Sequence, residues 1–155
     1  MENLEHSEDR LQRVKDLLAL RPERDGGLQA AVSYLRTEVA HYDWVGIYLL
    51  AGERLRLAAW DGPEATEHTD IGIGEGICGL AARTKQTVLV DDVDVRSEYL
   101  ACFPATKSEI VVPLISGEEC VGEIDVDSDK PSAFGEEDRE FLEAVAALLV
   151  GAYFK

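Results

Sequence analysis

A cysteine and three unusually placed acids stand out between Asp91 and Ser128. Cys102 lies in a loop, and the strand-like runs SEIVVPL and GEIDVDS that follow it contain Glu109, Asp125 and Asp127. Acids are depleted in strands and are almost never fully buried without a partner, so these three either lie on a solvated face or line a polar pocket. Asp125 and Asp127 are two residues apart in a strand and therefore share a face. A thiol beside carboxylic acids combines a nucleophile with a proton donor.

The cysteines of this chain are expected to be free or redox-active thiols. There are three of them, an odd number, and the N-terminus MENLEHSEDR has no apolar signal segment, which argues against a structural disulfide framework. Cys78 lies at an expected helix start, where a thiol pKa can be lowered, although the same place suits packing. Cys120 is given no role. His6, His41 and His68 show no ligand spacing with the cysteines, so we expect no metal site.

The composition predicts one soluble domain, residues 1–155, and excludes several partners. The 155 residues have a net charge of −16, with 31 acids against 15 bases, and would repel nucleic acid and anionic membranes. No apolar run approaches the roughly 18 residues of a membrane span. Without such a span or a signal segment, the expected location is the cytoplasm.

The first half of the chain reads as two helices followed by a β-hairpin. Apolar residues recur at helical spacing over Ser7–Leu20 and again over Leu28–His41, after Asp25-Gly26-Gly27. Trp44–Leu50 and Arg54–Trp60 are strand-like, and a turn separates them. The polar residues that follow, up to Asp70, are expected to form a loop.

The second half predicts a small helix, three strands and a last helix. A Gly-rich turn over Ile71–Gly79 resembles a phosphate cradle only weakly, because the Lys-Ser/Thr ending of a P-loop is missing. The expected elements are a helix over Leu80–Lys85, strands over Thr87–Val90, Glu109–Ile115 and Cys120–Val126, and a helix over Glu136–Phe154. This order predicts an α+β fold in which an antiparallel sheet carries helices on one face.

Six motifs together resemble a GAF domain, and more narrowly the GAF-domain free methionine-(R)-sulfoxide reductases. They are DWVGIYLL, GEGICG, VDDV, YLAC, SEIVVPL and GEIDVDS. The combination of YLAC, SEIVVPL and IDVDS, with a second cysteine in GICG, makes the likeness specific. It covers residues 43–154, so that residues 1–41 are N-terminal helices of the same single GAF-like domain.

The resemblance implies thiol-dependent reduction of free L-methionine-(R)-sulfoxide without a cofactor. It also implies a thioredoxin-like reductant and a homodimer. The residues that match family positions are catalytic Cys102, a second cysteine Cys78, the aromatic pocket residues Trp44 and Tyr48, and the substrate-holding carboxylates Glu109, Asp125 and Asp127. Aromatic residues at such spacing also commonly fill a core, which is the alternative for Trp44 and Tyr48.

Sulfoxide reduction leaves a sulfenic acid on the attacking cysteine, and a second thiol condenses with it to a disulfide that a dithiol reductant opens. Clustered carboxylates raise one another's pKa, so one can stay protonated as the acid while others hold the substrate's ammonium. The same cluster would raise the pKa of the Cys102 thiol and oppose thiolate formation.

The loop after the first hairpin departs from the family pattern. Family members usually carry a resolving cysteine there, whereas Gly62–His68 of this chain contains none. Either Cys78 takes that role, an external thiol does, or efficient turnover is lost. The alternative function is a non-catalytic GAF module that binds a small molecule as a sensor.

Overall fold

The computed structural model describes residues 2–95 and 105–154, so Cys102 lies outside the described residues. The helices within these ranges are α1 (Glu2–Ala19), α2 (Arg24–Glu38), α3 (Gly76–Thr84) and α4 (Glu136–Tyr153), with a short 3-10 helix η1 (Val93–Val95). The strands are β1 (Trp44–Ala51), β2 (Arg54–Asp61), β3 (Asp70–Gly72), β4 (Val88–Val90), β5 (Ser108–Ser116) and β6 (Glu119–Ser128).

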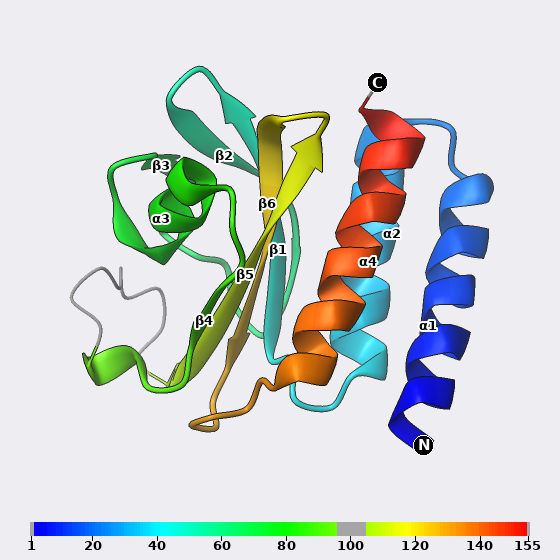
Figure 1. The fold of residues 1–155 in the computed structure, drawn as a ribbon, viewed down its shortest axis with the longest axis horizontal. Coiled ribbons are helices and arrows are strands. Elements are labelled where there is room, and N and C mark those ends of the chain that lie inside the picture. Colours follow the sequence, from blue (N-terminus) through cyan, green and yellow to red (C-terminus); the bar gives the residue numbers. More distant parts are fainter. Residues whose placement is uncertain (1, 96–104, 155) are drawn as a thin grey trace.

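The described strands form one antiparallel sheet in the order β3-β2-β1-β6-β5-β4 (Figure 1). Both hairpins expected from the sequence, β1–β2 and β5–β6, are confirmed. The hairpins join through β1 and β6, which are far apart in the sequence but pair along their length. This central pairing brings the DWVGIYLL and GEIDVDS motifs side by side.

Helices cover both faces of the sheet, which corrects the expectation that they lie on one face. The helices α1, α2 and α4 lie on one side of the sheet, and α3 lies on the other (Figure 1). The main core, which includes Leu35, Ile124 and Leu142, fills the first side, and a smaller core around Ile77 and Val111 fills the second. None of the described helices is both long and apolar enough to cross a membrane.

Three helix starts differ from the sequence prediction, and that of α1 is at Glu2 rather than Ser7. The helix expected to begin at Leu28 begins at Arg24, because Gly27 is a packing position inside it rather than a breaker. A Cβ on Gly27 would clash with the ring of Tyr153, whose hydroxyl donates a hydrogen bond to the Arg21 carbonyl over 2.8 Å. The helix expected from Leu80 begins at Gly76, so Cys78 lies inside it rather than before it.

Two further strand features were absent from the prediction. The residues Asp70–Gly72, expected as loop and turn, form the edge strand β3 opposite Arg54–Arg56 of β2. Arg54 Nε donates to Asp70 Oδ1 over 2.8 Å, a contact between distant residues that no local pattern contains. Strand β6 extends beyond the expected end at Val126 to Ser128, which agrees with the strand position already predicted for Asp127.

Candidate active site

The strand β6 presents a row of acids to the α3 side of the sheet. Glu123, Asp125 and Asp127 alternate with Ile124 and Val126, which belong to the main core on the opposite face. The three acids are 0%, 1% and 2% exposed. They line a buried polar site, and the solvated-face alternative is excluded for them.

The neighbouring strands place the other predicted residues on the same face. Glu109 of β5 pairs with Asp127 of β6, and Trp44 of β1 is the partner of Asp127 on the other side. Tyr48 pairs with Glu123, two residues before Asp125. Since Glu109 is only 4% exposed, four buried carboxyl groups lie on this face of the sheet, and two aromatic residues lie beside them.

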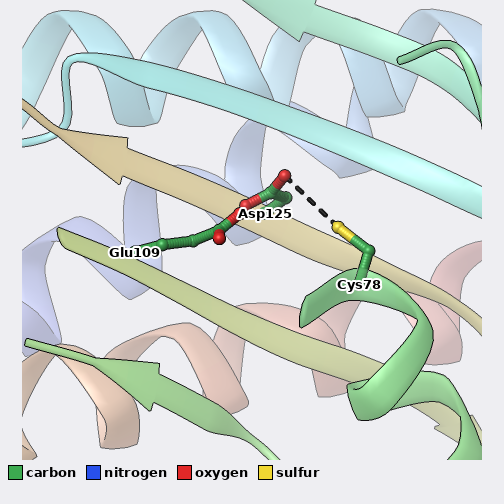
Figure 2. Close-up of side chains that lie close together, drawn as sticks. All are labelled: Cys78, Glu109 and Asp125. Atoms are coloured by element: carbon green, nitrogen blue, oxygen red, sulfur yellow. Dashed lines mark hydrogen bonds between the residues drawn. The ribbon is translucent and has the colours of Figure 1, made fainter. Parts of the chain in front are cut away.

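The first turns of α3 bring Cys78 onto this acidic row. The Cys78 thiol donates a hydrogen bond to Asp125 Oδ2 with an Sγ to Oδ2 distance of 3.4 Å (Figure 2). Glu109 reaches toward the same point from β5, and one donor atom from each of the three residues lies within 4.8 Å of the others. The structure therefore brings together Cys78, Glu109 and Asp125, which the sequence separates by up to 47 positions.

The described residues around the predicted nucleophile approach the same region. Cys102 itself lies outside the described residues. Val93 precedes Cys102 in the chain and Lys107 follows it. The Val93 N–H donates to the Lys107 carbonyl over 2.9 Å, and the Lys107 N–H donates to the Ser128 carbonyl over 2.8 Å. Both flanks of the segment that carries Cys102 are thus fixed beside Glu109 and the end of β6.

The side chain of Trp44 lies flat over the sheet because glycine leaves room for it. A Cβ on Gly46, two residues further along β1, would lie 2.3 Å from the indole ring, and a Cβ on Gly62 would lie equally close. The ring also stacks on Trp60 with a centroid distance of 6.3 Å. Gly46 pairs with Asp125 across the strands, so the ring forms a wall next to the acids.

Tyr48 connects the acidic face to the loop that follows the first hairpin. Its side chain is fully buried in the smaller core, and its hydroxyl donates to the His68 carbonyl over 2.7 Å. The loop closes on itself through a hydrogen bond from the His68 N–H to Thr66 Oγ1. Tyr48 therefore fills the core, which was the alternative to a pocket role. It also fixes the loop after the first hairpin, where this chain lacks the cysteine that family members usually carry.

Burial controls the ionisation of this site. It raises the pKa of Glu123 well above its ordinary value, and the nearby Asp125 raises it further. Burial likewise raises the pKa of Asp127, with a contribution from Asp125. The pKa of Asp125 is raised by burial and lowered in part by hydrogen bonds with Glu109 and Cys78. Burial consequently favours the neutral, protonated forms of these acids.

The Cys78 thiol shares this environment. Burial raises its pKa well above the ordinary value, and the charges of Asp125, Glu123 and Glu109 raise it further. The conflict between clustered acids and thiolate formation, which the sequence suggested for Cys102, is thus observed at Cys78. The pKa-lowering effect of a helix start does not prevail there, because the thiol is enclosed with carboxyl groups.

Glu123 is the site residue that sequence reasoning missed. It lies in the same motif as the two chosen acids, but only Asp125 and Asp127 matched family positions. The signal was the alternation itself, since residue 123 shares the face of residues 125 and 127. Neither carboxyl oxygen of Glu123 has a hydrogen-bond partner in the described structure.

We expect Glu123→Gln to stabilise the protein near pH 7.5. A carboxyl whose folded pKa is raised contributes stability below its unfolded pKa of about 4.3 and loses that contribution as the pH rises. The amide removes this loss, and we expect a gain of about 1 to 3 kcal/mol, seen as a rise of several degrees in Tm. Near pH 4 the difference should vanish. Glu118→Gln, at an exposed position, is the matched control. An unchanged or lower Tm for Glu123→Gln near pH 7.5 contradicts the prediction.

Comparison with known proteins shows the same fold and similar sequences. The GAF domain family matches residues 23–153, which includes α2 as well as the core expected from residue 43. GAF domain-containing protein A of Dictyostelium discoideum is 36% identical over 94% of this chain and 90% of its own length. The free methionine-R-sulfoxide reductase of Saccharomyces cerevisiae is 40% identical to this chain. The matched part covers 69% of this chain and 61% of the yeast protein.

Solved structures include two similar reductases. The type II free methionine-R-sulfoxide reductase from Thermoplasma acidophilum is 43% identical with a TM-score of 0.81, covering 88% of this chain and 94% of that chain. The free methionine-R-sulfoxide reductase from Neisseria meningitidis, solved in complex with its substrate, is 33% identical with a TM-score of 0.89. That match covers 95% of this chain and 87% of the Neisseria chain.

Proposed function

The chain belongs to the GAF-domain free methionine-(R)-sulfoxide reductase family, and on this premise we propose that it reduces free L-methionine-(R)-sulfoxide with Cys102 as the nucleophile. The observation that carries the proposal is the buried acidic face. Glu123, Asp125 and Asp127 form no ion pair in the described part of the chain. The ammonium group of a free amino acid would supply the missing positive charge, and a peptide-bound methionine has none to offer.

In the proposed reaction the acids and the Cys102 thiol have different roles. Glu109, Asp125 and Asp127 bind the ammonium, while an acid that still holds its proton gives it to the sulfoxide oxygen. The Cys102 sulfur attacks the substrate sulfur, and the protonated oxygen leaves that sulfur as water. Water then attacks the Cys102 sulfur, the sulfur–sulfur bond breaks with its electron pair going to methionine, one proton is released, and Cys102 becomes a sulfenic acid. Methionine leaves with two more electrons than the sulfoxide had. The raised pKa values of Asp125 and Asp127 favour this role because burial favours the protonated form of each carboxyl group.

Between the described residues, little space is left beside Cys78. The cavity enclosed beside Cys78, Glu109 and Asp125 has a volume of about 10 Å³, which is the space of one water molecule. An amino acid needs far more room. We expect Trp44 and Tyr48 to contact the thioether part of the substrate.

A coupled assay tests this function. NADPH oxidation is measured with thioredoxin, thioredoxin reductase and each methionine sulfoxide epimer, free or within a peptide. Turnover of the free R epimer alone supports the proposal, whereas turnover of no epimer with thioredoxin or dithiothreitol overturns it. The thioredoxin-like partner, the homodimer and the cytoplasmic location remain parts of the proposal, and light scattering tests the dimer.

The second candidate is a non-catalytic sensor, favoured by the absence of a cysteine in Gly62–His68. A putative GAF sensor protein from Burkholderia vietnamiensis also has a similar structure, with a TM-score of 0.89 at 30% identity. Calorimetric binding of methionine sulfoxide without release of methionine would favour this candidate.

The carboxylates should be individually important for the proposed reaction. We expect Glu109→Gln, Asp125→Asn and Asp127→Asn each to lower kcat/KM by about a hundredfold or more, because each amide keeps the size but loses the charge and the acid proton. Asp129→Asn, exposed and two residues beyond Asp127, is the control and should turn over normally. Normal turnover by all three site variants would remove the carboxylates from the mechanism.

A further inference from the structure

Three of the side chains that line the cavity at the start of α3 are good metal donors. Cys78 offers a sulfur, and Glu109 and Asp125 each offer an oxygen, with these atoms within 4.8 Å of one another (Figure 2). Donors bound at about 2.0 to 2.3 Å to a shared ion lie at most about 4.5 Å apart. Small side-chain movements would therefore place all three around one ion.

Independent observations show that this point can accept an ion. The three donors line the enclosed cavity of about 10 Å³, together with the first residues of α3. That volume holds one water molecule or one ion, and it is too small for the proposed substrate. Asp125 is 1% exposed, yet its Oδ1 has no hydrogen-bond partner in the described structure. A buried acceptor beside an ion-sized cavity is a site that lacks its positive charge.

The donor set determines which cation fits. Magnesium and calcium prefer oxygen ligands only, whereas one thiolate with two carboxylates suits a borderline-soft divalent cation such as zinc or cobalt. Such a cation would displace the thiol proton. The sequence-based expectation of no metal site rested on the spacing between histidines and cysteines. The present donor set combines one cysteine with two carboxylates and contains no histidine, so that spacing did not bear on it.

We propose that Cys78, Glu109 and Asp125 form a binding site for one thiophilic divalent cation, and that the bound cation excludes the substrate. The second part rests on the proposed function, because it assumes that Glu109 and Asp125 also hold the substrate's ammonium. Binding would then lock Cys78 as a metal thiolate. Zinc would therefore inhibit the reductase in competition with methionine sulfoxide.

Cobalt reports the site directly, without any measurement of activity. The reduced full-length protein, freed of metal with a chelator, is titrated anaerobically with Co²⁺. We expect one equivalent to produce a thiolate-to-cobalt charge-transfer band in the near ultraviolet, and Zn²⁺ to abolish it by displacement. Cys78→Ser should eliminate the band, and Asp125→Asn should weaken cobalt binding at least tenfold. Circular dichroism checks the fold of each variant.

The other cysteines provide matched controls. Cys102→Ser and Cys120→Ala should retain the band, since neither thiol belongs to the proposed set. Absence of the band in the wild-type protein, or its loss in Cys120→Ala or Cys102→Ser instead of Cys78→Ser, overturns the metal site.

Substrate competition is tested separately. Methionine-(R)-sulfoxide should lower the apparent cobalt affinity, and zinc should raise its apparent KM without changing kcat. A cobalt band that saturating substrate leaves unchanged overturns the exclusion of substrate while the metal site stands. Reductase turnover without any cobalt band overturns the metal site while the proposed function stands.

Discussion

Cys102→Ser is expected to lower kcat/KM for free methionine-(R)-sulfoxide by about a thousandfold or more while leaving the fold intact. Serine keeps the shape of cysteine, but its hydroxyl is a far weaker nucleophile toward sulfur. The loop that carries residue 102 leaves and re-enters the described structure beside Glu109, through the hydrogen bond between Val93 and Lys107. That anchoring supports a nucleophile delivered to the acidic face. The coupled assay and a thermal melt measure the two effects.

The control for this variant is a second cysteine replaced in the same way. Cys120 is buried on β6, and its thiol donates to the carbonyl of Gly122 over 3.2 Å, outside the acidic cluster. Cys120→Ser should therefore keep most of the activity. Residual turnover of Cys102→Ser near the wild-type rate would exclude Cys102 as the nucleophile, and a collapse of both variants would point to a folding defect.

Cys78→Ala is expected to release about one equivalent of methionine in a single turnover and then to stall with thioredoxin. No cysteine lies between Gly62 and Asp70, so Cys78 is the best remaining partner for oxidised Cys102. We expect steady-state turnover to fall about a hundredfold, and dithiothreitol to restore cycling because it reduces the sulfenic acid directly. Cys120→Ala should cycle normally with thioredoxin.

The position of Cys78 sets conditions on this recycling step. Its thiol is buried, and its raised pKa disfavours the thiolate that must attack the sulfenic acid. The hydrogen bond from Cys78 to Asp125 provides an acceptor for the thiol proton. A disulfide also requires Cα atoms within about 7 Å, so residue 102 must lie that close to Cys78 when the bond forms.

Peptide mapping after stoichiometric oxidation by the substrate decides the recycling partner. A Cys78–Cys102 linkage supports the assignment. A Cys102–Cys120 linkage, or a sulfenic acid that persists in the wild-type protein, contradicts it.

Local patterns determined much of this protein. Helical periodicity located α1 and α4, and alternation with turn residues located both hairpins, because these signals depend only on neighbouring residues. The strand period also placed Asp125 and Asp127 on one face, and the family motifs identified Glu109 as their companion. The sequence could not say whether that face was solvated, since a period of two residues defines two faces without saying what covers them.

Only the tertiary structure decided what covers the acids and what the site contains. The helix α3 packs on the face opposite the other helices, and this placement buries the acids and sets the Cys78 thiol 3.4 Å from Asp125. It also made Glu123 part of the site. The same long-range packing turned Gly27 into a helix residue beneath Tyr153. Each of these outcomes depends on contacts between segments far apart in the chain, which propensity and periodicity do not encode.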